Sequence, residues 1–210
     1  MFQIFLIILI IFLGFYIAEF VIKKPPVRFD IYFGVPGSGK TTFAAKIAKK
    51  AIKNKQKVLS NVPIKGTFKV EKSDIGHYQI DNCHLIIDEI GVDYNNRRFK
   101  SFTDEEVYFF KHHRHYRVHV YGFSQGYNDM DLKIRTLATR LYVVTPSLIP
   151  FFIKKKRIKK RIGIDDLTKQ IIDEYKFFFL GHRYIFAPAV WKMFKTEDAK
   201  ELPSKEWEQY

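Results

Sequence analysis

A glycine-rich segment near the start of the chain has the residue types and spacing of a phosphate-binding loop. Residues 34–41 read Gly-Val-Pro-Gly-Ser-Gly-Lys-Thr and fit the pattern G-x-x-x-x-G-K-[ST] at every fixed position. Glycines let backbone N–H groups approach phosphate oxygens, because no Cβ stands in the way. Lys40 would contact the β- and γ-phosphates of a nucleotide such as ATP, and the Thr41 hydroxyl would bind Mg²⁺. The predicted nucleotide contacts are Gly34, Val35, Pro36, Gly37, Ser38, Gly39, Lys40, Thr41 and Thr42.

Two acidic residues follow a mostly apolar segment further along the chain. Residues 83–87 read as a buried strand, and Asp88 and Glu89 come directly after it. A phosphate loop needs such a partner, since a carboxylate completes the Mg²⁺ shell and a second one polarises the attacking water. Asp88 is therefore the predicted metal ligand with Thr41, and Glu89 is a predicted catalytic residue.

The elements that must position these residues alternate between strand and helix patterns. An apolar strand over 29–33 precedes the phosphate loop, and a helix over 42–53 follows it. Further strands are predicted over 58–60, 83–87, 118–123 and 140–144, with helices over 103–115 and 131–139. Thr103 and Glu106 have the spacing of a capping box at the start of the first of these helices. This order predicts an α/β fold of three layers around a mainly parallel sheet, as in P-loop NTPases. Lys40, Asp88 and Gln125 all fall just past strand ends, where ligands bind in such sheets.

The N-terminal segment predicts a membrane anchor. Residues 2–22 are almost wholly apolar, and about 20 such residues cross a bilayer core of about 30 Å. Residues 1–5 carry no positive charge and no small-residue cleavage site is visible, so an uncleaved transmembrane helix over 1–22 is favoured over a secretory signal. Lys23 and Lys24 lie in a linker over 23–27 and place the following domain on the cytoplasmic side.

Composition narrows the classes of partner. The 210 residues include 36 Lys and Arg against 22 Asp and Glu, giving a formal net charge of +14. A surface this basic favours phosphate backbones or anionic lipid headgroups. Cys83 is the single cysteine, which excludes an internal disulfide and suits a reducing cytosol.

Arginines and histidines after the acidic pair are candidates for catalytic and metal-binding roles. Ring ATPases commonly stabilise the transition state with an arginine, often from the neighbouring subunit, and Arg135 and Arg140 are the candidates, with Arg114 behind them. The alternative for each is a solvated or DNA-facing charge. His112 and His115 have helical i, i+3 spacing, but no nearby Cys or carboxylate completes a zinc site, so a polar or DNA-facing helix end is preferred.

The C-terminal part of the chain is strongly basic. Seven of the eight residues 154–161 are Lys or Arg, which could neutralise DNA phosphates or lie against anionic lipid, while a solvated disordered run is the alternative. A helix over 165–176, a closing hairpin from 177–180 to 184–186, and core positions for Trp191 and Phe194 are predicted. We divide the chain into an ATPase core over 28–146, a basic extension packed on it over 147–195, and a polar tail over 196–210.

Several of these features together resemble the zonular occludens toxin (Zot) family of filamentous-phage assembly proteins, relatives of the FtsK/HerA-type ATPases. The resemblance covers about residues 29–144, extends to 184–194, and rests on residues 85–89, Arg114-His115, Ser124-Gln125, residues 131–135 and Ser60-Asn61. It implies that Gln125 is a polar sensor on a strand between the phosphate-loop strand and the acidic strand. It also implies an ATPase at the host inner membrane that drives extrusion or assembly of a single-stranded DNA virion.

One departure from that family limits what is carried over. In its better-known members the ATPase comes first and a membrane span follows, whereas here the apolar segment precedes the phosphate loop. No second span is apparent after residue 144, so the toxin-like portion has no visible place in this sequence. A homo-oligomeric ring, with a hexamer as the candidate size, and single-stranded DNA or phage coat and assembly proteins are the implied partners.

Two classes of function remain open from the sequence. The first is the membrane-anchored ATPase, and the second is a nucleotide-gated membrane scaffold that binds ATP and recruits partners without processive hydrolysis. Glu89 and Gln125 favour the first, because a pure binder needs no groups that polarise water. A small-molecule kinase ranks last, since no arginine-rich lid segment stands out.

Overall fold

The computed structural model describes residues 27–94, 102–164 and 171–194, together with residues 9, 11, 12 and 14; of residues 160–181 it gives no side chains. The predicted anchor over 1–22, apart from those four residues, and the tail over 196–210 therefore lie outside the described residues. Within the described part, none of the helices has the length and apolar character needed to cross a bilayer.

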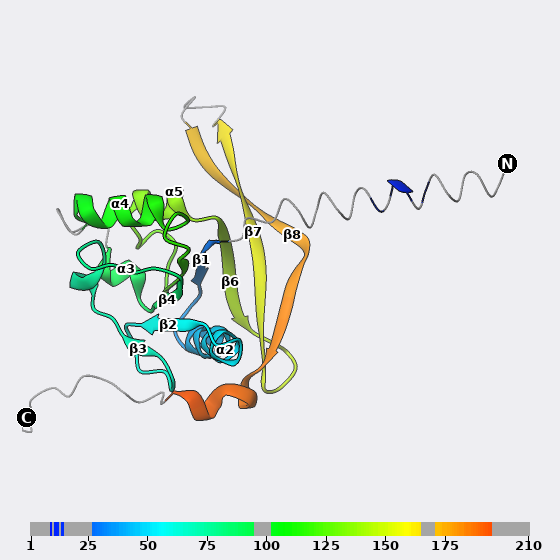
Figure 1. The fold of residues 1–210 in the computed structure, drawn as a ribbon. Coiled ribbons are helices and arrows are strands. Elements are labelled where there is room, and N and C mark those ends of the chain that lie inside the picture. Colours follow the sequence, from blue (N-terminus) through cyan, green and yellow to red (C-terminus); the bar gives the residue numbers. More distant parts are fainter. Residues whose placement is uncertain are drawn as a thin grey trace, which may run out of the picture.

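Eight strands of the described residues form one twisted sheet in the order β3-β2-β4-β5-β1-β6-β7-β8 (Figure 1). The strands are β1 Phe29–Phe33, β2 Lys57–Ser60, β3 Phe68–Lys69, β4 Cys83–Ile87, β5 His119–Ser124, β6 Arg140–Pro146, β7 Phe152–Ile164 and β8 Ile171–Phe186. Neighbours from β3 to β6 pair in parallel, while β7 and β8 are antiparallel additions at one side. The predicted α/β fold with a mainly parallel sheet is confirmed.

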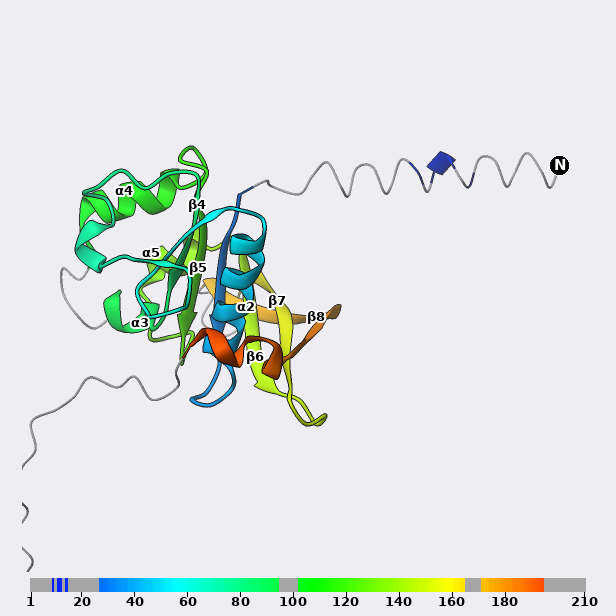
Figure 2. The ribbon, with the colours of Figure 1, turned by 60° about the horizontal axis from the view of Figure 1, so that its bottom comes forward.

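Helices cover both faces of the sheet, which makes three layers (Figures 1 and 2). On one face lie helix α2 and the 3-10 helix η2, and on the other lie α3, α4 and α5. Their bounds are α2 Lys40–Lys53, α3 Ile90–Asp93, α4 Asp104–His112, α5 Leu132–Leu137, η1 Lys72–Asp74 and η2 Ala187–Met193. Because side chains alternate along a strand, Ile31 of β1 packs into the cluster under α3, α4 and α5, while its neighbour Tyr32 packs into the one under α2.

Local sequence explains where α4 begins. The Thr103 hydroxyl accepts a hydrogen bond from the Glu106 N–H at 3.3 Å, and the Thr103 N–H donates to the Glu106 carboxylate at 2.8 Å. This reciprocal pair satisfies two backbone donors that a helix start otherwise leaves without partners. The predicted capping box is confirmed.

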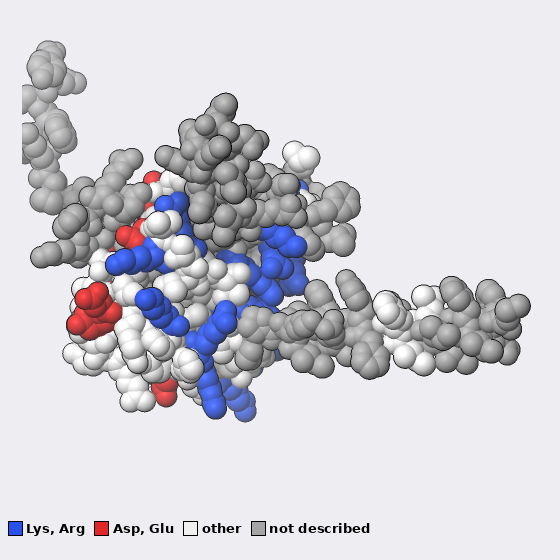
Figure 3. Space-filling view, turned by 90° about the horizontal axis from the view of Figure 1, so that it is seen from above, with Lys and Arg blue, Asp and Glu red and all other residues white. Residues whose placement is uncertain are grey.

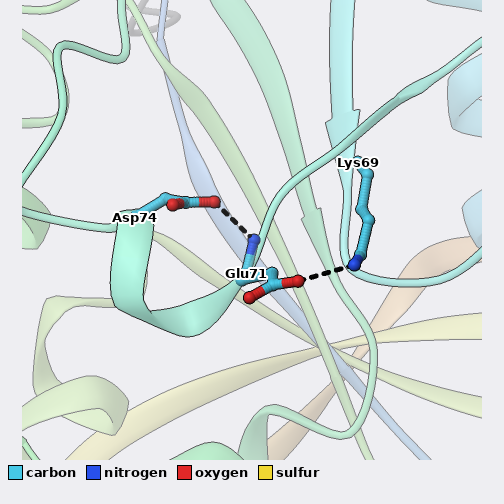
Figure 4. Close-up of polar contacts among 3 residues, drawn as sticks. All are labelled: Lys69, Glu71 and Asp74. Atoms are coloured by element: carbon cyan, nitrogen blue, oxygen red, sulfur yellow. Dashed lines mark hydrogen bonds and ion pairs between the residues drawn. The ribbon is translucent and has the colours of Figure 1, made fainter.

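The segment after β3 is held by short-range polar contacts. The Lys69 ammonium pairs with the Glu71 carboxylate, and the Glu71 N–H donates to Asp74 Oδ2 at 2.8 Å at the start of η1 (Figure 4). The Lys69–Glu71 pair is exposed, so it contributes little to stability. The hydrogen bond to Asp74 closes the turn and leads the chain back toward β4.

The C-terminal predictions were wrong in their secondary structure. Residues 171–176, predicted as helix, are part of β8, and residues 177–186 continue the same strand, so no turn lies at 181–183. The reason is that β7 offers a long antiparallel partner, and the β-branched and aromatic residues of this segment suit a strand. Trp191, predicted in the core, is half-exposed on η2, whereas Phe194 packs partly buried beside the α2 cluster.

The basic run over 154–161 is a strand and not a disordered segment, because it lies within β7. Its Lys155 lies under α2, where its ammonium donates to the Tyr32 hydroxyl at 3.1 Å and sits 4.1 Å from the centre of the Tyr142 ring. Burial lowers the pKa of Lys155 to about 8, although Asp30 opposes the shift. The charge of Lys155 therefore lies inside the fold, against aromatic rings.

Candidate nucleotide-binding site

The phosphate loop joins the end of β1 to the start of α2. Gly37 and Gly39 have φ angles of 75° and 95°, and Gly39 is the N-cap residue of α2. A Cβ at Gly39 would also collide with the side chain of Ile153 on β7, so glycine is required there for two reasons. The loop therefore presents its backbone at a helix N-terminus, which favours binding of an anionic phosphate group.

Lys40 is the first residue of α2 and is mostly buried. Its ammonium folds back over the loop and donates to the carbonyl oxygens of Gly34 at 2.8 Å and Val35 at 3.3 Å. These contacts hold the positive charge inside the loop. The arrangement places the ammonium where it can exchange carbonyl partners for phosphate oxygens.

Thr41 and Asp88 meet across the edge of the sheet. The Thr41 hydroxyl donates to Asp88 Oδ2 at 3.5 Å, and the Glu89 N–H donates to Asp88 Oδ1 at 3.1 Å. Burial raises the pKa of Asp88, and the neighbouring Glu89 adds to the increase. A hydroxyl and a carboxylate at this separation fit the oxygen ligands that Mg²⁺ prefers. Among the described residues no group of three His, Cys, Asp or Glu forms a metal site by itself, so the ion would need phosphate and water ligands as well.

Glu89 and Gln125 lie beside each other at the same edge. Glu89 adopts the left-handed region, with φ 51°, at the start of α3, and Gln125 Nε2 donates to Glu89 Oε1 at 3.2 Å. Gln125 follows β5, and β5 lies between β4 and β1. That strand order was implied by the resemblance and is confirmed. The left-handed backbone of a non-glycine residue is a strained conformation of the kind found at functional sites.

Asn61 is a site residue that the list of predicted residues lacked. Its Oδ1 accepts from the Asp88 N–H at 2.7 Å, and its Nδ2 donates to the Asp88 carbonyl at 2.9 Å. One side chain from the end of β2 thus fixes the backbone that carries both acidic residues. The only signal in the sequence was Ser60-Asn61 at a strand end, because the partner lies 27 residues away.

Among the described residues, no hydrogen bond joins a candidate arginine to the phosphate loop of the same chain. Arg140 lies at the start of β6, level with Asp30, whereas the loop follows the end of β1. The Arg114 guanidinium group donates to the Thr139 hydroxyl at 3.4 Å, next to the start of β6. Arg135 of α5 donates to Asn128 Oδ1 at 3.3 Å and lies 4.9 Å from the centre of the Tyr127 ring. A role for any of them in a neighbouring subunit's site stays a prediction.

Within the described part of the chain, the histidines at the end of α4 belong to no group of three or more metal-ligating residues. His112 and His115 rings lie 5.8 Å apart, and no third Cys, His or carboxylate of the described part joins them in a metal-binding group. His112 Nδ1 instead contacts the Tyr108 carbonyl at 2.9 Å. The interpretation as a polar helix end fits these contacts.

Strand order, layers and phosphate loop together define the fold of the P-loop NTPases. A scan against models of protein families found no match, and a search of curated proteins found none either. Among solved structures, the chain is similar to the N-terminal domain of zonular occludens toxin from Neisseria meningitidis. The identity is 18%, the TM-score 0.51, and the match covers 80% of this chain and 99% of that one. The genome packaging NTPase B204 from Sulfolobus turreted icosahedral virus 2, in complex with AMP, matches with 10% identity and a TM-score of 0.49 over 72% and 98% of the two chains. The predicted likeness to the Zot domain is confirmed at the level of the fold.

Proposed function

We propose that this chain is a membrane-anchored P-loop ATPase that drives assembly, extrusion or packaging of single-stranded phage DNA at the host inner membrane. The observation that carries the ATPase proposal is the grouping at one edge of the sheet. There, the Lys40 ammonium bonds the carbonyl groups of the phosphate loop, and hydrogen bonds link Thr41 of α2 to Asp88 and Glu89 after β4 and to Gln125 after β5. A protein that only binds nucleotide needs the loop but not the Glu89–Gln125 pair.

Each residue has a distinct role in the proposed hydrolysis. The loop backbone and Lys40 bind and orient the phosphates, and Thr41 and Asp88 would hold Mg²⁺, which supplies positive charge to the reacting phosphate when bound. Glu89 would accept a proton from the attacking water. Gln125 holds the Glu89 carboxylate through its amide and would contact the γ-phosphate, so it links nucleotide binding to the position of the base.

The biological setting has separate support. The Zot-like fold supports an assembly ATPase, the formal charge of +14 suits a nucleic-acid partner, and the apolar residues 2–22 support a single-pass anchor with the ATPase domain in the cytoplasm. A ring of identical subunits would let an arginine such as Arg135 or Arg140 reach the site of a neighbour. Single-stranded DNA or phage coat and assembly proteins would be the substrates of the motor.

The test is ATP hydrolysis by the full chain reconstituted in vesicles, with and without single-stranded DNA. We expect Lys40→Ala to lose nucleotide binding and at least about 100-fold in turnover, because phosphate charge is then left unpaired. Glu89→Gln is expected to bind ATP normally and to lose turnover about 100- to 10,000-fold. Lys46→Ala, an exposed lysine on the same helix, is the matched control and should behave as the parent chain.

The alternative, a nucleotide-gated scaffold, predicts a different pattern. Such a protein would bind ATP tightly without turnover, and Glu89→Gln would change nothing measurable. Turnover that single-stranded DNA stimulates and that both variants abolish would contradict the scaffold. Tight binding without turnover at high protein concentration in membranes would contradict the motor.

A further inference from the structure

The strands of the parallel sheet begin at an edge that carries charge of mostly one sign. We call this the amino edge and define it by the basic residues Arg28, Lys55, Lys57, Arg114, Arg117 and Arg140, which lie at or just before the starts of β1, β2, β5 and β6 or at the end of α4. Figure 3 views the molecule from this side, where Lys and Arg side chains gather over the centre of the described surface. Two acidic residues lie beside them, the exposed Asp81 and the buried Asp30, whose carboxyl group interacts with Arg140 and Arg28.

A cavity of about 360 Å³ opens at this edge. Arg114 and Arg117, both exposed, line it, together with His84 and His119, whose rings stack with centroids 4.8 Å apart. His84 is 9% exposed; its Nδ1 contacts the Tyr121 hydroxyl at 3.1 Å, and its buried Nε2 has no hydrogen-bond partner in the described part. The guanidinium groups of Arg114 and Arg117 on the lining of this cavity favour an anionic ligand, and a phosphate offers the paired oxygens that a guanidinium group binds.

Val27 lines the same cavity and lies close in the sequence to the predicted anchor. Val27 comes five positions after residue 22, and an extended chain over that many steps reaches at most about 17 Å. If residues 2–22 cross the bilayer, the surface around Val27 must therefore face the headgroups. The phosphate loop follows the opposite end of β1 and would face away from them.

The hairpin of β7 and β8 extends past the same edge. The pairing of β6 with β7 ends at Leu141 and Ile158, near the start of β6, but β7 and β8 continue to pair as far as Ile164 and Ile171. The projecting arm is visible at the top of Figure 1, and its β7 part includes the basic residues 159–161. A two-stranded ribbon is only marginally stable alone in water, so a surface beneath it would stabilise it.

We propose that the amino edge is a docking surface for anionic lipid headgroups and that the cavity between Arg114 and Arg117 receives a headgroup phosphate. This inference rests on the anchor in the proposed function and adds the orientation of the domain. Lipid is favoured over DNA because the short linker would leave a DNA strand to pass between the domain and the bilayer.

The test is native mass spectrometry of the full chain released from detergent micelles with either phosphatidylglycerol or phosphatidylcholine. We expect phosphatidylglycerol to remain bound and phosphatidylcholine to leave, with at least a tenfold loss of bound phosphatidylglycerol in Arg114→Glu/Arg117→Glu. Arg114→Gln/Arg117→Gln should give an intermediate loss. Lys65→Glu/Lys192→Glu makes the same charge change at exposed lysines near the other edge and should retain the lipid.

Three outcomes would overturn the proposal. They are equal retention of both lipids, retention of phosphatidylglycerol by the glutamate variant, and a variant that loses single-stranded DNA binding while keeping the lipid. ATP turnover in detergent should not change in the single variant Arg117→Glu, which leaves the candidate catalytic residue Arg114 in place, so failure of this surface is distinguishable from failure of the ATPase. Flotation of the chain with neutral and with anionic vesicles tests the anchor separately. A chain that floats only with anionic vesicles lacks the anchor but keeps the docking surface. A chain that floats with neither kind of vesicle contradicts both the anchor and the docking surface.

Discussion

The two edges of the parallel sheet differ in the charges that they carry and in how those charges are held. At the edge where the strands end, Lys40, Asp88 and Glu89 carry both signs of charge and are held by carbonyl, amide and hydroxyl groups of the same chain. At the edge where they begin, Arg114 and Arg117 line a cavity together with His84 and His119. Hydrogen bonds within the chain thus hold the charged groups of the first edge, whereas we infer that the second edge binds an anion from outside. On this view, the sheet separates the proposed catalytic site from the proposed docking surface.

The largest expected effect is at Gly39 of the phosphate loop, where the structure leaves no room for a side chain. We expect Gly39→Ala to weaken nucleotide binding by at least about 100-fold and to cost about 1–3 kcal/mol of stability, because φ 95° strains alanine and the new Cβ meets Ile153. Titration with a fluorescent nucleotide and thermal unfolding measure the two effects.

Gly37→Ala is the matched control, since its φ is also positive but nothing lies within 4 Å of the added Cβ. It should show the strain without the collision. Truncating the partner in Gly39→Ala/Ile153→Ala should recover part of the stability. Equal behaviour of both glycine variants would show that β7 does not constrain the loop.

The next effect concerns the acidic pair. We expect Asp88→Asn to lower ATP turnover about 100- to 1,000-fold and to raise the Mg²⁺ concentration needed for half-maximal activity, because the carboxylate beside Thr41 is lost. A Mg²⁺ titration of turnover measures this. Asp81→Asn at the amino edge removes the same charge from an exposed position and should leave the titration unchanged. A similar loss in both variants would remove the distinction between the edges.

A smaller effect is expected at Asn61, which positions the acidic pair through its hydrogen bonds to the Asp88 backbone. Asn61→Ala should lower kcat about tenfold with little change in KM, and should cost about 1–2 kcal/mol, because the buried N–H and carbonyl of Asp88 lose their partner. Steady-state kinetics and urea unfolding measure these quantities. A change in KM alone would assign Asn61 to nucleotide binding instead.

The phosphate loop and the acidic pair could be recognised in the sequence because their signals are local. A glycine-rich loop at a strand end and an acidic pair at another are readable without knowing the partners, and a parallel sheet brings such ends together. Asn61 could not be assigned in this way, since its role depends on a contact across two strands. The β7–β8 hairpin was not predicted, because a run of lysines and arginines lacks the alternation of apolar and polar residues that indicates a strand. Lys155 belongs to that run, but its ammonium group lies over the rings of Tyr32 and Tyr142.

The smallest predicted effect sharpens the description of the amino edge through its pH dependence. Burial lowers the pKa of His84 from its ordinary 6.5 to about 4, with a further contribution from the neighbouring His119. Between these values the unfolded chain binds a proton that the folded chain does not, so stability is lost as pH falls from about 6.5 to about 4. His84→Gln should retain a contact to the Tyr121 hydroxyl and flatten this part of the curve, as urea unfolding at pH 7, 5.5 and 4.5 would show. His77→Gln, at an exposed position, should leave the curve unchanged, and equal curves for all three chains would mean that His84 is already solvated.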